Sequence, residues 1–160
     1  MSEAPHLLII EAPYYRQISD ELGKGAAAAL DAAGATYDRL EVPGAFEIPA
    51  AIRMNIKAME LVGGRRRYDG YIALGCVIRG ETPHFDFVAG PCAEALMKLQ
   101  SCESPSTSLQ QPPIIFGVLT TDDRAQALAR SGGDRGHKGR DCAESAIEMA
   151  QLLKKIRSSK

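Results

Sequence analysis

The chain has 160 residues, 45% of them apolar and 24% charged, and a formal net charge of −1 at pH 7. This length and composition are typical of one globular domain, expected over residues 1–160, and they exclude a disordered chain. The balanced charge gives no general electrostatic reason to bind nucleic acid or an anionic membrane surface, and no apolar run reaches the roughly 20 residues of a membrane-spanning helix.

Short apolar runs alternate with segments of helical periodicity along the chain. The runs predict strands at 7–10, 71–78 and 114–119, and residues 36–42 are interpreted as a further strand. Apolar residues at helical spacing predict helices at 18–33, 46–62, 85–99 and 142–156, with a short helix after the fourth strand. Side-chain caps are expected at Ser19 or Asp20 for the first helix and at Thr120 or Thr121 for the short one, and Gly34 would end the first helix.

Two segments outside these elements have a distinct composition. The glycines between 132 and 139 predict a turn before the last helix, and the Ser/Pro/Gln-rich stretch 102–113 predicts a loop. The alternation of strands and helices predicts an α/β fold, with a four-stranded parallel sheet between helices and right-handed crossovers. Ligands of such folds bind beyond the carboxyl ends of the strands, which directs attention to residues 11–15, 43–47, 75–84 and 119–123.

Four cysteines are spread widely over the chain, at Cys76, Cys92, Cys102 and Cys142. None forms a Cys-x-x-Cys pair, which argues against a zinc site. The first residues lack the basic segment and the long apolar stretch of a secretory signal. We therefore expect a cytoplasmic protein with free thiols and no bound metal.

The ends of the first two predicted strands carry candidate ligand-binding residues. Tyr14 and Tyr15 could stack on a planar ligand or pack against a neighbouring helix or subunit, and the sequence leaves both open. Pro43-Gly44 predicts a tight turn before a helix, whose free backbone N–H groups would face the same crevice. Glu47 in that first turn could accept hydrogen bonds from ligand hydroxyl or amide groups, or simply stabilise the helix dipole.

The end of the third predicted strand is the richest segment. Gly80 allows unusual backbone angles, and Thr82 with the amides near it could hold an anionic group at a helix start. His84, two residues on, can give and take protons near neutral pH, although a lone histidine is more often structural. Basic residues further on suit either a solvated loop or an anion site: Arg130, Arg135, His137, Lys138 and Arg140.

Four long motifs then resemble a known family. They are Val-Pro-Gly-Ala-Phe-Glu-Ile-Pro (42–49), Ala-Leu-Gly-Cys-Val-Ile-Arg-Gly-Glu-Thr-Pro-His-Phe-Asp (73–86), Phe-Gly-Val-Leu-Thr-Thr (116–121) and Gly-His-Lys-Gly-Arg-Asp-Cys-Ala-Glu-Ser-Ala-Ile-Glu-Met (136–149). Together and in this order, from about residue 7 to about 155, they resemble 6,7-dimethyl-8-ribityllumazine synthase.

This resemblance implies an enzyme of riboflavin synthesis that uses no cofactor. It would condense 5-amino-6-(D-ribitylamino)uracil with 3,4-dihydroxy-2-butanone 4-phosphate and release the lumazine, phosphate and water. It implies a three-layer α/β/α fold with a flavodoxin-like sheet. It also implies a homo-oligomer, either a pentamer or an icosahedral shell of twelve pentamers, with active sites between subunits. Riboflavin synthase is a further candidate partner.

Carried over by motif, the resemblance assigns roles within one subunit. Tyr14 would stack on the pyrimidine ring, although the family often has phenylalanine or tryptophan there, and His84 would transfer protons. The ribityl chain would be held by Ala45, Phe46 and Glu47. The uracil edge would be bound through the backbone of Cys76, Val77 and Ile78. The phosphate pocket would be lined by Glu81, through its amide, and by Thr82.

The adjacent subunit would complete each site. The resemblance implies that Phe116, Arg130 and Lys138 come from that neighbour, with Arg130 holding the phosphate. Arg135, His137 and Arg140 keep the interpretation of a solvated basic loop.

Two other functions are possible for this fold. One is a carrier protein that binds a flavin or lumazine without catalysis, which would need no proton-transferring histidine. The other is a response-regulator-like signalling domain, which would need an acidic cluster after the first strand and an aspartate after the third. Glu11 is a single acid, and residues 75–80 contain no aspartate. The sequence does not decide between pentamer and shell, and segment 102–113 looks longer than is typical of the family.

Overall fold

The computed structural model describes residues 4–61, 67–101 and 112–159. Its central sheet has four parallel strands in the order β2-β1-β3-β4: β1 (His6–Glu11), β2 (Thr36–Glu41), β3 (Gly70–Ile78) and β4 (Ile114–Thr121). The helices are α1 (Arg16–Ala32), α2 (Ile48–Leu61), α3 (His84–Ser101), α4 (Arg124–Arg130) and α5 (Lys138–Ser158). A 3₁₀ turn, Ala45–Glu47, precedes α2, and a two-stranded hairpin of β5 (Ser131–Gly133) and β6 (Gly136–His137) precedes α5.

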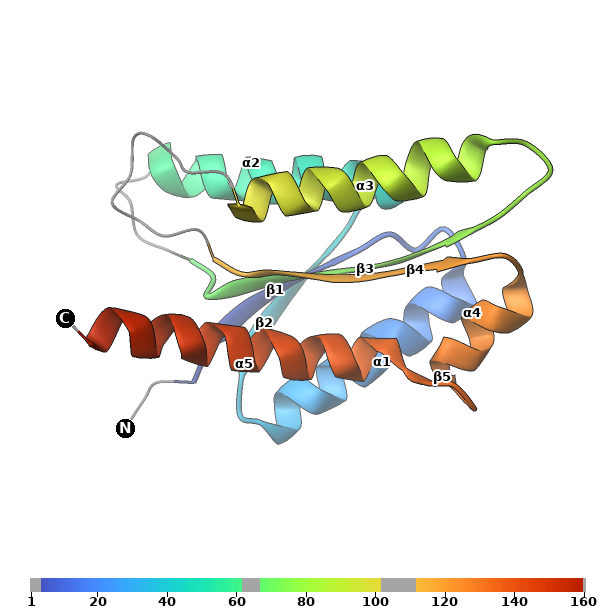
Figure 1. Cartoon of the computed structure of the whole chain (residues 1–160). Coiled ribbons are helices and arrows are strands. Elements are labelled where there is room, and N and C mark those ends of the chain that lie inside the picture. Colours follow the sequence, from blue (N-terminus) through green and yellow to red (C-terminus); the bar gives the residue numbers. More distant parts are fainter. Residues whose placement is uncertain (1–3, 62–66, 102–111, 160) are drawn as a thin grey trace.

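The helices form two layers around the sheet. Figure 1 shows α2 and α3 together over one face, and α1 and α5 over the other, with α4 at the end of β4 on the α1 side. The predicted three-layer α/β/α architecture with a four-stranded parallel sheet is confirmed. None of the helices in the described ranges combines the length and the apolar composition needed to span a bilayer.

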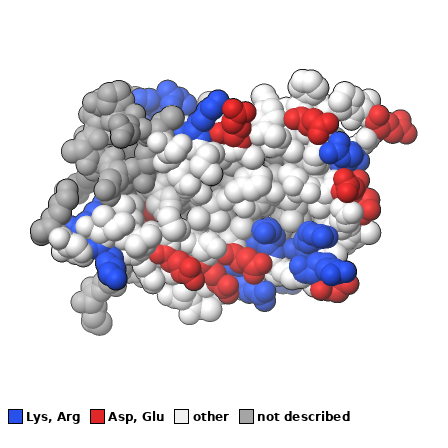
Figure 2. Space-filling model, in the orientation of Figure 1, with Lys and Arg blue, Asp and Glu red and all other residues white. Residues whose placement is uncertain are grey.

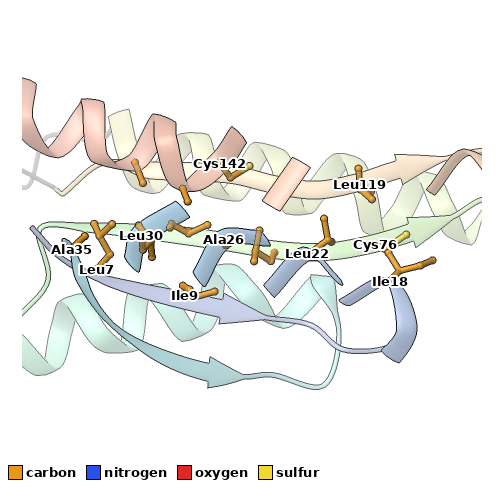
Figure 3. Close-up of a cluster of buried hydrophobic side chains, with 14 of the residues drawn as sticks. Leu7, Ile9, Ile18, Leu22, Ala26, Leu30, Ala35, Cys76, Leu119 and Cys142 are labelled. Carbon is orange, nitrogen blue, oxygen red and sulfur yellow. The ribbon is translucent and has the colours of Figure 1, made fainter. Parts of the chain in front are cut away.

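Alternate side chains of the buried strands enter opposite halves of the core. Leu7 and Ile9 of β1 face α1 and α5, where they join a cluster that includes Leu22 and Leu30 (Figure 3). Leu8 and Ile10 face α2 and α3 instead. Because successive side chains of a strand point to opposite faces, a strand covered on both sides must be apolar throughout. This is why the continuous apolar runs predicted β1 and β3 correctly, whereas the edge strand β2 is largely exposed and carries charged residues.

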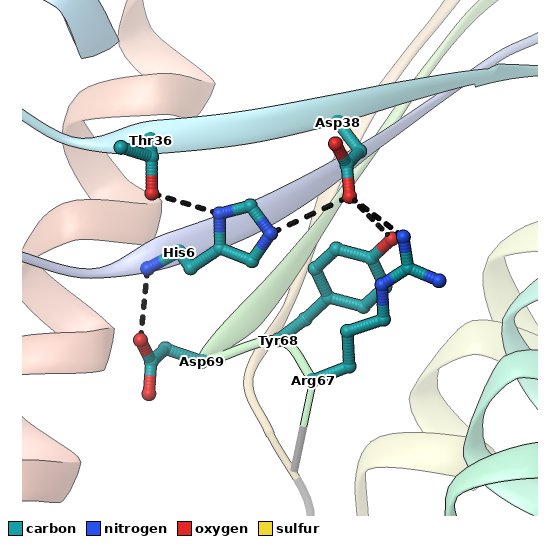
Figure 4. A network of polar contacts seen from close by, with 6 residues as sticks. All are labelled: His6, Thr36, Asp38, Arg67, Tyr68 and Asp69. Carbon is teal, nitrogen blue, oxygen red and sulfur yellow. Dashed lines mark hydrogen bonds and ion pairs between the residues drawn. The ribbon is translucent and has the colours of Figure 1, made fainter.

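A polar network joins the strands at the end where they begin. In Figure 4, His6 lies between Thr36 and Asp38 of the neighbouring strand, with its ring nitrogens 2.8 Å from Thr36 Oγ1 and 3.4 Å from Asp38 Oδ2. The Tyr68 hydroxyl donates to the same Asp38 oxygen at 2.8 Å. Burial, and then this bond, raise the pKa of Tyr68 to about 12. The network ties β1 and β2 to the segment that enters β3.

A buried ion pair lies near the other end of β1. The carboxylate of Glu11 accepts two hydrogen bonds from the guanidinium of Arg39 on β2, at 2.7 and 2.8 Å, and its side chain is only 5% exposed. Gly23 of α1 leaves the room that this pair needs, since a Cβ at Gly23 would overlap Glu11 Oε1. A paired and hydrogen-bonded carboxylate is the form in which a buried charge is tolerated.

Helices α1 and α5 approach each other so closely that only glycine fits at one point. A Cβ on Gly139 would overlap the backbone carbonyl oxygen of Leu22. His137, just before α5, packs its ring against Gly25 of α1, and its Nδ1 accepts a hydrogen bond from the Arg140 N–H at 3.4 Å. The expectation of a fully solvated basic loop is therefore wrong for His137, which caps α5 and is half-buried.

Two of the expected helix caps are wrong. Helix α1 begins at Arg16 without a side-chain cap, and Ser19 is buried on its inner face. Thr120 and Thr121 do not cap α4 but continue β4, where they pair with the last residues of β3. Asp123 caps α4 instead, accepting from the Gln126 N–H at 2.8 Å. Gly34 ends α1 as expected, with a φ of +69° that favours glycine.

The cysteines that the structure describes are free thiols, as expected. Cys76, Cys92 and Cys142 are buried, and burial raises the pKa of each to about 11. Cys102 and nearly all of the predicted loop 102–113 lie outside the described residues. On the face shown in Figure 2, basic and acidic side chains are interspersed around a middle made of other residues, in keeping with the balanced charge.

Candidate active site

A cavity of about 660 Å³ opens at the carboxyl ends of the strands. Its walls come from the segments after β1, β2 and β3, which are three of the four regions that the sequence indicated. Of the described residues after β4, none belongs to its lining. The side chains that shape it come from Tyr14, Tyr15, Ala45, Phe46, Glu47, Cys76, Val77, Ile78, Thr82, His84, Phe85, Phe87 and Val88.

The order of the strands explains why a cavity forms at this point. After β1 the chain turns to α1 on one face of the sheet, and after the adjacent strand β3 it turns to α3 on the other face (Figure 1). Connections that diverge from neighbouring strands leave a crevice between them, the usual ligand site of an open α/β sheet. The position of the cavity therefore follows from the order of the strands and the direction of their connections, whichever side chains line it.

The first wall follows β1 and is aromatic. Tyr14 and Tyr15 meet edge to face with their ring centroids 5.0 Å apart. Tyr15 packs against the core, and burial is the main reason that the pKa of its hydroxyl is raised. Tyr14 is 75% exposed. Tyr15 is thus anchored in the core and contacts the Tyr14 ring. A face of Tyr14 stays exposed and is available to a planar ligand.

The second wall follows β2 and presents a carboxylate. The Glu47 N–H donates to the carbonyl of Gly44 at 3.1 Å and closes the 3₁₀ turn. The Glu47 carboxylate lies over Gly44, because a Cβ at Gly44 would stand only 3.0 Å from Glu47 Oε2. Glu47 is exposed and lines the cavity. An exposed carboxylate at a cavity wall can accept hydrogen bonds from the hydroxyl groups of a ligand.

The third wall follows β3 and ends at the start of α3. Strand residues Cys76, Val77 and Ile78 form its base. Beyond the loop, the His84 N–H donates to Thr82 Oγ1 at 3.4 Å, and His84 is the first residue of α3. Free backbone N–H groups at a helix start suit an anionic ligand, and an imidazole beside them can move protons. The Cys76 thiol, with its pKa of about 11, stays neutral near pH 7.

Known proteins of similar sequence match nearly the whole chain. The family model described as 6,7-dimethyl-8-ribityllumazine synthase matches residues 4–154. The chain belongs to this family.

Individual relatives agree with the family match. The protein named 6,7-dimethyl-8-ribityllumazine synthase 1 of Rhizobium meliloti strain 1021 is 45% identical over 155 residues, which are 97% of this chain and 95% of that protein. Proteins named 6,7-dimethyl-8-ribityllumazine synthase from Agrobacterium fabrum strain C58 and Bartonella bacilliformis are each 47% identical over 152 residues, or 95% of this chain and 97% and 92% of theirs. The resemblance based on four motifs is therefore confirmed.

The cavity brings together most of the residues that the family motifs single out. It gathers Tyr14, Ala45, Phe46, Glu47, Cys76, Val77, Ile78, Thr82 and His84. Glu81 is exposed in the loop between Gly80 and Thr82 and does not belong to the lining. The cavity therefore brings together, within one chain, nine of the predicted site residues from the segments that end or follow β1, β2 and β3.

Three predicted site residues lie away from this cavity. Phe116 is on β4, and its carbonyl accepts a weak hydrogen bond from Cys142 Sγ of α5 at 3.8 Å. Lys138 is the first residue of α5, one turn before Cys142. Arg130 ends α4 and donates from Nη1 to the carbonyl of Gln126 at 3.0 Å. These residues belong to the β4 side of the molecule.

Sequence reasoning missed several residues that line the cavity. Phe87 and Val88 lie three and four positions after His84, so all three share one face of α3. That spacing could have indicated Phe87, which is 69% exposed. Phe85, the first residue of the helix predicted at 85–99, is half-buried and lines the cavity. No pattern in the sequence marked it, because its position depends on how the loop before α3 folds.

Proposed function

We propose that this chain catalyses the condensation of 5-amino-6-(D-ribitylamino)uracil with 3,4-dihydroxy-2-butanone 4-phosphate in riboflavin synthesis. The reaction would form 6,7-dimethyl-8-ribityllumazine and release phosphate and water, without a metal or redox cofactor. One observation carries the proposal. In a chain that belongs to the lumazine synthase family, Tyr14, Glu47 and His84 line one cavity although they come from three separate strand ends.

The roles proposed for these residues follow from their chemistry. The exposed ring of Tyr14 would stack on the pyrimidine, and the carboxylate of Glu47 would accept hydrogen bonds from the hydroxyl groups of the ribityl chain. The backbone at 76–78 would bind the uracil edge, since these residues line the cavity and pair with β4 on one side, while the pairing of β3 with β1 on the other side ends at Leu74. Thr82 and the amides at the start of α3 would hold the phosphate.

The proposed mechanism depends on holding two substrates together. The amino group of the uracil attacks the ketone, and loss of water gives an imine. Phosphate then leaves, and the resulting enol tautomerises and closes the second ring with loss of another water. His84 would move the protons, and Arg130 of a neighbour would stabilise the departing phosphate. Proximity and orientation in the shared cavity would supply much of the acceleration.

The site is proposed to be completed by a second copy of the chain. Three aromatic side chains at the cavity are largely exposed in one protomer: Tyr14, Phe46 and Phe87 are 75%, 58% and 69% exposed. Exposed apolar groups clustered at a binding site are typical of a surface that a partner covers. We propose a cytoplasmic pentamer or a shell of pentamers, and riboflavin synthase stays the candidate partner.

An activity assay tests the proposed reaction. Purified protein mixed with both substrates should form lumazine absorbance and phosphate faster than the uncatalysed reaction does. A folded, oligomeric protein that binds the product but gives no acceleration would refute the proposal and favour the carrier alternative. Light scattering on the same sample distinguishes a pentamer from a sixty-subunit shell.

A complementation experiment tests whether the site is shared between subunits. His84→Ala and Arg130→Ala variants should each be nearly inactive. If Arg130 serves the neighbour's cavity, co-assembly of the two variants creates some interfaces in which both residues are wild type, about one site in four for random mixing around a ring. Activity would then return. Mixed oligomers that stay as inactive as the separate variants would place both residues in the same subunit's site.

A further inference from the structure

Arg79 is the first residue after β3, and its side chain lies outside the cavity lining. Its N–H donates to the carbonyl of Thr121, the last residue of β4, at 2.9 Å. The backbone of Arg79 is therefore still fixed by the sheet, while the next residue, Gly80, begins the exposed loop that leads to His84. Arg79 stands where the rigid sheet ends and the loop starts.

The guanidinium of Arg79 contacts two other segments of the chain. Its two terminal nitrogens lie 3.4 Å from the two carboxylate oxygens of Asp86 in the first turn of α3. Its Nε lies 3.4 Å from Asp122 Oδ1, in the connection between β4 and α4. Its central carbon also lies 4.2 Å from the ring centroid of Phe85, a stacking contact of an arginine on an aromatic ring.

These contacts span the loop that carries two predicted site residues. Thr82 is inside the loop, and His84, Phe85 and Asp86 follow each other in the first turn of α3. Asp122 is itself held, because its N–H donates to Gln126 Oε1 of α4 at 2.9 Å. The guanidinium thus connects the start of α3 to a fixed point on the α4 side of the sheet.

The loop has little else to hold it among its described contacts. A Cβ at Gly80 would meet nothing within 4 Å. The bonds made by the loop are local, from the His84 N–H to Thr82 Oγ1 at 3.4 Å and from the Asp86 N–H to the carbonyl of Pro83 at 3.0 Å. An arginine can hold three groups at once because its planar fork carries five N–H donors, whereas lysine presents a single flexible ammonium.

The same contacts affect the local charge. Asp86 and Asp122 place two carboxylates near the start of α3, where the proposed function would bind a phosphate. Two unpaired carboxylates would repel that phosphate, and the Arg79 cation offsets them.

We propose that Arg79 is a positioning residue: it fixes the first turn of α3, with Thr82 and His84, against the sheet and offsets two carboxylates beside the phosphate end of the cavity. This proposal rests on the proposed function. It adds a residue that touches no substrate and acts through Asp86, Asp122 and Phe85.

The test compares two substitutions with a control on the same helix. Arg79→Met keeps most of the chain that covers Phe85 but removes the charge, and Arg79→Lys keeps the charge but loses the fork. Lys98→Met is the control, because it breaks an exposed ion pair of α3, Lys98 with Glu94 at 3.0 Å, away from the loop. For each protein, kcat, the KM of each substrate and the amide hydrogen exchange of residues 80–85 are measured.

For Arg79→Met we expect kcat to fall about tenfold, because small displacements of reacting groups are costly. The KM of the phosphate-bearing substrate should rise severalfold while the KM of the pyrimidine changes less than about twofold, a split that general loss of stability would not produce. Arg79→Lys should lower kcat similarly but raise that KM less, since the charge is kept. Exchange at 80–85 should be faster in both and unchanged in the control.

Unchanged kcat and KM values in Arg79→Met would overturn the proposal, even with faster exchange. If Arg79→Met does not fold, Asp122→Asn is used instead, because it removes only the ion pair between Arg79 and Asp122 and keeps the shape of the side chain. Kinetics equal to wild type in Asp122→Asn would also overturn the proposal. If wild-type protein lacks the condensation activity, the proposed function fails by itself. The exchange data then still decide whether Arg79 holds the loop, because unchanged exchange in folded Arg79→Met would refute that.

Discussion

The contact between α1 and α5 predicts that a glycine-to-alanine substitution lowers stability, whereas the same substitution inside a helix usually raises it. Gly139 is buried near the start of α5, and a Cβ there would overlap the carbonyl oxygen of Leu22. Replacing glycine by alanine inside a helix normally stabilises a protein by about 0.5–1 kcal/mol. Gly139→Ala should instead destabilise this one.

The size of the effect follows from what must move. The atom that the new methyl group meets is backbone, which cannot rotate away as a side chain can, so one helix must shift. Overpacking of a buried contact costs about 1–3 kcal/mol. With the helix-propensity gain subtracted, we expect a net loss of about 1 kcal/mol, and of at most about 2.5 kcal/mol.

Urea denaturation followed by circular dichroism measures this loss, at one protein concentration because assembly contributes to apparent stability. Gly90→Ala in α3 is the matched control, since a Cβ there meets nothing within 4 Å. It should stabilise the protein by about 0.5–1 kcal/mol. If Gly139→Ala is as stable as wild type or more so, the close approach of the two helices is not as described and the reasoning fails.

Arg39→Met would leave the carboxylate of Glu11 buried without a partner, and because the Arg39 side chain is 46% exposed we expect the low end of the roughly 3–5 kcal/mol typical of broken buried pairs. An unaltered urea midpoint would contradict this. The Tyr68 hydrogen bond is the main cause that lowers the pKa of Asp38, so this carboxylate stabilises the fold above about pH 4 and the stabilisation is lost as the pH falls through the lowered pKa. The stability of Asp38→Asn, measured from pH 7 downward, should therefore converge with that of wild type in acid, and a constant gap would be the contrary result. His84→Ala should lower kcat by up to about 10²-fold in the condensation assay, and a normal kcat would remove His84 from the chemistry.

The sequence predicted the layers of the fold well because burial on both faces leaves a direct mark on the strands. The runs around Ile9 and Ile72 are apolar throughout, and both strands lie in the middle of the sheet. The first residues of the helices and their caps were harder to predict from the sequence. Thr-Thr-Asp-Asp at 120–123 offers several capping residues, and pairing of β4 with β3 decides among them by drawing both threonines into the sheet.

The site was predictable only as far as single segments reveal it. His84 and Glu47 each follow a strand within one motif, so their neighbourhood at the strand ends could be inferred from topology. The contact between Arg79 and Asp122 could not, because the two residues are far apart in the chain and meet through the register of β3 with β4. The link from His6 to Tyr68 is hidden for the same reason.

The polar network around His6 and Tyr68 lies at the opposite end of the strands from the cavity. The residues of this network are therefore distinct from those that line the cavity. Changes in the loops after β1, β2 and β3 can alter what the cavity accepts while the strand starts keep the sheet in register. Conversely, substitutions around Asp38 can change the stability of the fold without replacing any residue of the cavity lining.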